Sequence, residues 1–229
     1  MSDILHQTRN MVSEYMSGFD PSHDMYHVDR VTRLALTIAK DGINQGQDID
    51  LEMVELAALC HDVGDRKYYN GKETGGQLIQ IFLNQHNYAK ADLVAKIVDH
   101  IGFSKELGWD DKMDPAEQVQ WRNTCLELHA VQDADKLDAI GAFGILRCAA
   151  YSGAKNRTLY VPNDKPIENL TQEVYQNQTE SSAINHFHEK LFKLKDMMRT
   201  PKGKSLALER HQFMELFVSK VNDEYNMIG

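Results

Sequence analysis

A histidine and an aspartate stand side by side at the end of an apolar run in the segment LCHDVGDRKYY, which covers residues 59 to 69. The pair is His61 and Asp62, and burying such polar groups without partners is costly. A bound cation removes this cost, because imidazole nitrogen and carboxylate oxygen are both metal ligands. The segment therefore raises the hypothesis of a metal site, with the hydrolytic chemistry that a bound metal supplies.

Other polar residues continue the apolar faces of predicted helices. His27 shares a helix face with the apolar positions 31, 34 and 38, and His61 continues the face of positions 51, 54 and 58. His100 continues the face of positions 93 and 97, and Asp135 continues the face of positions 128 and 131. A lone inward histidine is most often a satisfied core residue, but several inward polar groups would each need a partner, whereas one cation satisfies them all. Mixed nitrogen and oxygen ligands suit Mn²⁺, Fe²⁺, Co²⁺ or Ni²⁺, and Mg²⁺ less well.

Two neighbouring aspartates are candidates for the metal ligand on the predicted helix at 125–150. Asp133 and Asp135 are two residues apart on a predicted helix, so they do not share a face. Asp135 continues the stripe of Leu128 and Val131, and we therefore prefer it. Asp138 lies one turn further on the same side, where it would either orient a metal ligand or bind nearby backbone.

The element pattern predicts an all-α fold. Strand-like alternation is scarce, and most of the 5 prolines and 14 glycines fall between helical segments. Helices are predicted near residues 28–39, 51–60, 91–103, 125–150, 183–198 and 204–226, with a break in the fourth near Gly141. The segments SKELGWDDKMDP (104–115) and YSGAKNRTLYVPNDKPIENLTQ (151–172) are predicted to be loops.

Charge and cysteine content narrow the class of protein. The net charge of the 229 residues is −9, which argues against a nucleic-acid binder but permits a local basic pocket for a small phosphorylated ligand. The 3 cysteines form no CxxC pair, which is typical of buried thiols in a reducing compartment. We find no signal peptide or membrane-spanning run. We expect a cytoplasmic protein without a membrane partner, and leave a nuclear location and a homodimer open.

The order His27, His61-Asp62, Asp135 resembles the H…HD…D signature of the HD superfamily of metal-dependent phosphohydrolases. SHDMYHVDRVTRLA, LAALCHDVGDRKY, VDHIGFSKE and VQDADKLDAIGAFGILR are similar to one bacterial and fungal branch, which includes nucleotide pyrophosphohydrolases. The resemblance covers nearly the whole chain, although DPAEQVQWRNTCLELHAVQ is longer than in the bacterial forms. We expect a single HD-type helical domain over 1–229, with its HD core at about 20–150, a polar loop at about 151–180, and C-terminal helices at about 181–226 packed on the core.

The resemblance implies the chemical roles of five residues. His27, His61, Asp62 and Asp135 would bind one divalent metal ion, for which Mn²⁺ is our first choice and Mg²⁺, Co²⁺, Ni²⁺ and Fe²⁺ are alternatives. Asp65, three residues after Asp62, would be the general acid or base, so that Asp62 and Asp65 are the expected catalytic carboxylates. The alternative for Asp65 is a carboxylate that only ends a helix.

Basic residues near these ligands are candidates for substrate binding. The predicted group consists of His23, Lys67, His100 and Arg30. His23 lies beside a predicted helix cap, Lys67 could belong to a solvated basic turn, and His100 could be a core histidine. Arg147 is a further candidate for reaching a phosphate, and His186 for closing the pocket.

The predicted function is metal-dependent hydrolysis of a phosphorylated small molecule. The branch favours a nucleotide substrate and release of pyrophosphate from nucleoside triphosphates. A 5′-nucleotidase acting on monophosphates would use the same residues, and a non-catalytic metal- or ligand-binding module is an alternative of a different class. A purely structural set of ion pairs is the third alternative.

Overall fold

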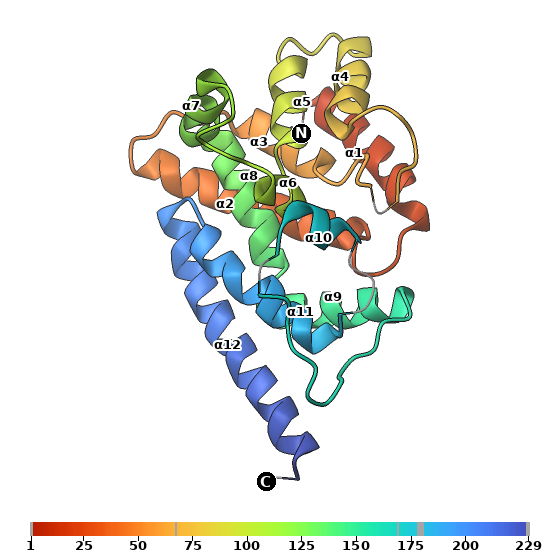
Figure 1. The fold of residues 1–229 in the computed structure, drawn as a ribbon. Coiled ribbons are helices and arrows are strands. Elements are labelled where there is room, and N and C mark those ends of the chain that lie inside the picture. Colours follow the sequence, from red (N-terminus) through yellow and green to blue (C-terminus); the bar gives the residue numbers. More distant parts are fainter. Residues whose placement is uncertain (1, 67, 169, 178–180, 228–229) are drawn as a thin grey trace.

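The computed structural model describes residues 2–66, 68–168, 170–177 and 181–227 (Figure 1). Within these ranges the chain forms α-helices and two 3₁₀ helices and no strand, which confirms the all-α prediction. The elements are α1 (Asp3–Tyr15), η1 (Met16–Gly18), α2 (Met25–Asn44), α3 (Leu51–Cys60), α4 (Gly75–Gln85), α5 (Ala91–Asp99), α6 (Phe103–Leu107), α7 (Ala116–Thr124), α8 (Leu126–Asp138), α9 (Gly141–Ala154), α10 (Gln172–Asn177), α11 (Ala183–Glu189), η2 (Leu191–Met197) and α12 (Pro201–Tyr225).

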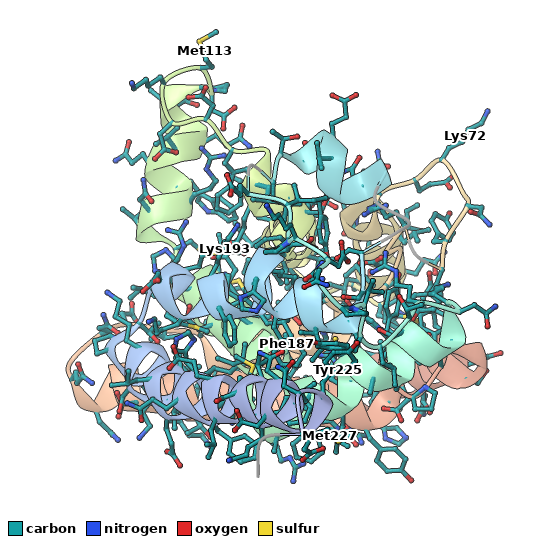
Figure 2. The ribbon with its side chains drawn as sticks, turned by 60° about the horizontal axis from the view of Figure 1, so that its bottom comes forward. Lys72, Met113, Phe187, Lys193, Tyr225 and Met227 are labelled. Carbon is teal, nitrogen blue, oxygen red and sulfur yellow. The ribbon has the colours of Figure 1, made fainter. Side chains whose placement is uncertain are left out.

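The core lies where α2, α3 and α8 pack against one another. Figure 1 shows α8 in the middle of the molecule, and α8 contacts α2, α3 and the C-terminal α12. Val31, Leu56 and Leu128 from these three helices are fully buried, and burial of such side chains is the main driving force for folding. Loop tips point outward, as Lys72 and Met113 show in Figure 2. No helix in the described ranges is long and apolar enough to cross a membrane.

Local capping fixes where the central helices begin. The side chain of Asp24 accepts a hydrogen bond from the backbone N–H of His27 at 2.9 Å, and that of Asp50 caps α3 by accepting from Met53 N–H at 3.1 Å. An aspartate at this position satisfies a backbone donor that the helix itself leaves unpaired. The cap of α2 therefore also fixes the position of His27, in the first turn.

A tight turn follows α3 and carries the His61-Asp62 pair. Gly64 has a φ of +74°, and a Cβ atom there would lie 2.7 Å from Cα of Gly75. Only glycine tolerates both that conformation and that close approach. The backbone N–H of Gly64 donates to the Tyr15 hydroxyl at 3.0 Å, which joins the turn to α1.

The irregular segments contain more structure than the sequence predicted. The helix predicted at 183–198 is wrong as a continuous element, because Lys190 leaves helical geometry between α11 and η2. Both predicted loops also contain helix: α6 extends into 104–115, α9 continues to Ala154 and α10 begins at Gln172. The break near Gly141 is confirmed, since α8 and α9 are separate and Gly141 has a φ of +75°.

Asp133, the rival of Asp135, anchors α12. Its buried carboxylate accepts from the backbone N–H groups of Arg199 and Thr200 at 2.9 and 2.8 Å, and from the Thr200 hydroxyl at 2.7 Å. Gly203 lies against it, since a Cβ there would be 2.3 Å from Asp133 Oδ2. Charge-assisted bonds of this kind hold the N-terminus of α12 on α8.

We expect Asp133→Asn to lower the free energy of unfolding by about 1–3 kcal/mol, because a buried charged acceptor loses its charge while its donors stay. Urea unfolding followed by circular dichroism measures this change. Asp223→Asn, which alters an exposed pair with Lys220, is the control and should change stability by less than about 0.5 kcal/mol. Equal, small effects of the two substitutions would contradict the anchoring role.

Candidate metal centre and adjoining cavity

Three ligand atoms converge in the interior where α2, the turn after α3, and α8 meet. His27 Nε2 lies 3.1 Å from His61 Nε2, and Asp62 Oδ2 lies 3.3 Å from the first nitrogen and 3.4 Å from the second. All three residues are buried. Asp135 Oδ1 lies 4.0 and 3.8 Å from the two nitrogens. The structure thus brings together the four residues predicted as metal ligands.

The outer nitrogens of the two imidazoles determine which atoms carry protons. His27 Nδ1 lies 2.7 Å from Asp138 Oδ2, and His61 Nδ1 lies 2.8 Å from the carbonyl oxygen of Ala58. A carboxylate and a carbonyl only accept, so both Nδ1 atoms donate and neutral rings present a lone pair at Nε2. Asp62 Oδ2 makes no hydrogen bond among the described residues. Three lone pairs therefore face one another, which is the donor arrangement that a divalent cation fits.

In the metal-free chain a proton can supply the positive charge that these three atoms favour. Burial lowers the pKa of His61, but the carboxylates of Asp62 and Asp135 outweigh burial and raise that pKa to about 9. Burial likewise opposes ionisation of Asp62, but the positive charge of His61 holds the pKa of that carboxyl well below its usual range. Both shifts favour an imidazolium at His61 and a carboxylate at Asp62 near neutral pH in the metal-free chain.

Asp138 supports the centre from behind. Its carboxylate accepts from His27 and, at 2.8 and 3.0 Å, from Nε and Nη2 of Arg30. Burial acts against ionisation, yet these hydrogen bonds lower the pKa of the Asp138 carboxyl. This bond fixes the ring of His27, which favours the first of the two predicted roles of Asp138, the orientation of a residue predicted to bind metal.

Arg30 and His100, two of the residues predicted to bind substrate, do not line the cavity at the centre. Arg30 is held on Asp138 and over the ring of Phe143, 4.3 Å from its centroid, and does not line the cavity at the centre. His100 points to α7, where its ring lies 4.9 Å from that of Trp121. The buried face of α5 is Val94, Ile97 and Val98, not the predicted stripe through position 93. In this structure Arg30 therefore supports Asp138 and His100 packs among aromatic rings, and neither lines the cavity beside the centre.

The centre forms part of the wall of a cavity of about 570 Å³. His23 and Asp65, two candidates named from the sequence, line it, whereas Lys67 lies outside the described residues. Its cationic lining also includes Arg66, Lys105, Lys136, Arg147 and Lys190. None of the three lysines was predicted from the sequence to lie at the site. Small-molecule sites commonly have volumes of about 300–1,000 Å³, so the cavity can enclose a ligand larger than a phosphate ion.

Lys105 and Lys136 are held by neighbours in the same wall. Lys136 pairs with Glu106 at 2.7 Å, and Lys105 donates to the carbonyl oxygen of Val98 at 3.0 Å. Enclosure in the cavity lowers the pKa of Lys105, although nearby carboxylates including Asp99 and Asp65 oppose this. Lys105 falls in a segment without clear periodicity, so the sequence offered no signal for its inward position.

Comparison with known proteins identifies a matching family and several similar chains. The HD domain family matches residues 25–140. The uncharacterized protein YpgQ of Bacillus subtilis is 34% identical over 223 residues, covering 95% of this chain and 92% of YpgQ. A crystal structure from Lactobacillus plantarum has a TM-score of 0.81 at 34% identity, covering 99% of both chains. The structure of YpgQ in complex with ADP has a TM-score of 0.71 at 30% identity, covering 98% of this chain and 100% of that one. A Bacillus thuringiensis structure described as an HD-superfamily hydrolase has a TM-score of 0.68 at 30% identity, covering 98% and 97%.

We expect Asp138→Asn to weaken Mn²⁺ binding by about 10- to 100-fold, because the carboxylate that orients His27 loses its charge. Calorimetric titration of the metal-stripped chain measures the affinity. Asp133→Asn is the matched control, since it removes a buried carboxylate from the same helix and should leave Mn²⁺ affinity within about twofold. Equal losses in both variants would show that the effect of Asp138 is only structural.

Metal binding should release about one proton at pH 7, because the pKa of His61 is about 9 in the metal-free chain and the metal takes the unprotonated ring. Titrations of Mn²⁺ in buffers of different ionisation enthalpy measure the number of protons released. Release should decline as the pH rises through 9, where His61 is already neutral. An observed heat that is independent of buffer at pH 7 would contradict this assignment.

Proposed function

The chain belongs to the HD domain family, and we propose that it is a metal-dependent phosphohydrolase that acts on nucleotides and releases pyrophosphate from nucleoside triphosphates. The observation that carries this proposal is the convergence of His27 Nε2, His61 Nε2 and Asp62 Oδ2 on the wall of a cation-lined cavity. Ion pairs that served stability alone would not need a cavity beside them.

The metal would be held by His27, His61, Asp62 and Asp135. Mn²⁺ is the cation that we propose, with Mg²⁺, Co²⁺, Ni²⁺ and Fe²⁺ as alternatives that nitrogen and oxygen donors also accept. When bound there, a divalent cation lowers the pKa of a water and polarises a phosphoryl group. Asp138 keeps the Nδ1 proton of His27 in place, so that Nε2 stays available as a donor atom.

We assign Asp65 the role of proton carrier. Its side chain lines the cavity together with Asp62, and its backbone N–H donates to the carbonyl oxygen of Asp62 at 3.2 Å, which fixes it one turn beyond that ligand. A carboxylate at this position can take a proton from the attacking water or give one to the leaving oxygen. His23 and Arg66, on the same wall, would bind phosphoryl oxygens.

Two observations support a nucleotide as the substrate. The cavity is large enough for more than a phosphate ion, and cationic side chains line it although the whole chain carries a net charge of −9. The related YpgQ of Bacillus subtilis has a structure in complex with ADP. A 5′-nucleotidase would use the same metal ligands, and only the number of phosphates that the site holds separates the two reactions.

A hydrolysis panel tests the proposed function. Metal-stripped protein is supplied in turn with Mn²⁺, Co²⁺, Ni²⁺ and Mg²⁺, and given ribo- and deoxyribonucleoside mono- and triphosphates. We expect pyrophosphate from triphosphates, with Mn²⁺ giving the highest rate. Phosphate from monophosphates would establish the nucleotidase instead. Absence of any product, with metal shown to be bound, would leave a non-catalytic binding module.

Asp65→Asn should lower kcat by about 100-fold or more, because an amide cannot carry the proton. Stopped assays of the metal-loaded variant measure kcat, and calorimetry should show Mn²⁺ affinity within about threefold of wild type. Asp92→Asn, on the exposed surface of α5 where Asp92 accepts from Gln80, is the control and should keep full activity. If Asp65→Asn left kcat unchanged, the proton-carrier role would be wrong and Asp65 would only end the turn.

A further inference from the structure

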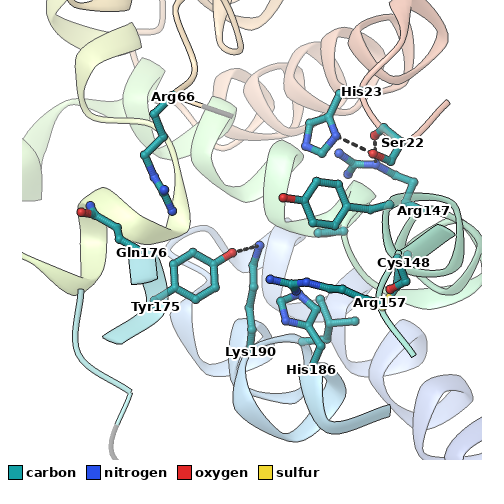
Figure 3. Close-up of a pocket in the computed structure, with 15 residues that line it drawn as sticks. Ser22, His23, Arg66, Arg147, Cys148, Arg157, Tyr175, Gln176, His186 and Lys190 are labelled. Carbon is teal, nitrogen blue, oxygen red and sulfur yellow. Dashed lines mark hydrogen bonds between the residues drawn. The ribbon is translucent and has the colours of Figure 1, made fainter. Parts of the chain in front are cut away.

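A second, smaller chamber adjoins the cavity of the metal centre and is lined by cationic side chains. We call it the cationic chamber and define it by Arg66, Arg147, Arg157 and Lys190, with His23 and His186 beside them. Figure 3 shows the charged ends of Arg66, Arg157 and Lys190 pointing from different segments into one space. Its volume is about 160 Å³, which is below the range of sites that enclose a whole drug-sized ligand. The chamber therefore suits one part of a ligand.

The chamber is positive in a chain that is negative overall. No aspartate or glutamate is among the described residues that line it, whereas the net charge of the chain is −9. The positive charges of Lys190 and Arg157 both affect the pKa of the same buried thiol, that of Cys148. Burial raises the pKa of the Cys148 thiol to about 11, while the charges of Lys190 and Arg157 act in the opposite direction. A lining that combines several positive side chains with no carboxylate is one that a phosphate group favours.

Arg147 links the chamber to the metal centre. Its Nε donates to the carbonyl oxygen of Ser22 at 2.7 Å, its Nη2 lies 3.3 Å from His27 Nε2, and its Nη1 lies 3.4 Å from Asp138 Oδ2. Arg147, His23, Arg66 and Lys190 line both the chamber and the metal-site cavity. A phosphate chain that begins at the metal ligands can therefore continue past Arg147 toward Arg157 and Lys190.

We propose that the cationic chamber binds the phosphates beyond the one that reacts, so that the substrate is a nucleoside triphosphate with its β- and γ-phosphates in the chamber. This inference rests on the proposed function. A water oxygen forms a bond to the α-phosphorus, and the bond from that phosphorus to the bridging oxygen breaks. Pyrophosphate leaves with the electron pair of that bond, and one proton of the water passes to Asp65. The products are a nucleoside monophosphate and pyrophosphate, the latter held by Arg157 and Lys190 until it dissociates.

Binding measurements test the chamber without relying on turnover. The Mn²⁺-loaded protein is titrated with α,β-methylene ATP, with AMP and with inorganic triphosphate. Arg157→Gln and Lys190→Gln should each weaken binding of α,β-methylene ATP and inorganic triphosphate by about tenfold, because each removes a charge-assisted contact, and should leave AMP within about twofold. Arg157→Lys keeps the charge and should lose less than about threefold. Circular dichroism checks that each variant is folded.

Lys193→Gln is the matched control. It removes the same charge three residues after Lys190, from an exposed position outside the chamber, and should change none of the three affinities. Equal weakening of AMP and α,β-methylene ATP, with inorganic triphosphate unaffected, would place the nucleoside in the chamber and overturn the proposal. Unchanged affinities in both chamber variants would overturn it as well.

Parallel hydrolysis assays separate this inference from the proposed function. One outcome is that triphosphates bind with the expected dependence on Arg157 and Lys190 while no nucleotide is hydrolysed. In that case the proposed function is wrong, and the assignment of the chamber as a phosphate-binding site is kept. If triphosphates are hydrolysed but both chamber variants bind them like wild type, the function stands and the chamber assignment is wrong.

Discussion

Two imidazole nitrogens and one carboxylate oxygen lie within 3.1 to 3.4 Å of one another in the interior, and the rest of the site depends on this contact. With neutral imidazoles none of the three atoms can donate a hydrogen bond to another, because His27 and His61 each use their Nδ1 proton elsewhere. Burying three such acceptors is unfavourable unless a positive charge lies among them. A proton on His61 can supply it in the metal-free chain, and a divalent cation satisfies all three atoms at once.

The helix caps and turns around the centre hold His27, His61 and Asp62 in contact. The Asp24 cap sets His27 in the first turn of α2, and the Gly64 turn keeps His61 and Asp62 at the end of α3. The last turn of α8 then brings Asp135 toward the imidazoles and Asp138 behind His27. Apolar packing of the three helices therefore determines the geometry of the polar centre, and the cavity lies where that packing ends.

The features predictable from sequence are those carried by helical periodicity. His27, His61 and Asp135 continue the apolar stripes of helices that the structure contains. The stripe of Leu128 and Val131 led us to prefer Asp135 to Asp133 as a ligand, and Asp133 in fact anchors α12. His100 was misplaced because the stripe was drawn through Leu93, which is 44% exposed. Arg157 and Lys190 lie where regular helix is interrupted, and tertiary contacts alone bring them to the site. Arg30 is positively charged and lies on the same helix as His27, but its hydrogen bonds to Asp138 hold its side chain outside the cavity.

Anomalous diffraction from crystals grown with Mn²⁺ is the experiment that decides whether these three atoms bind a metal, because it locates the cation and its ligands in one map. We expect a single strong peak within about 2.0–2.3 Å of His27 Nε2, His61 Nε2 and an oxygen of Asp62, with Asp135 as the fourth protein ligand. Manganese peaks only at other positions, with the two Nε2 atoms still 3.1 Å apart, would contradict it and leave the centre as a structural ion pair.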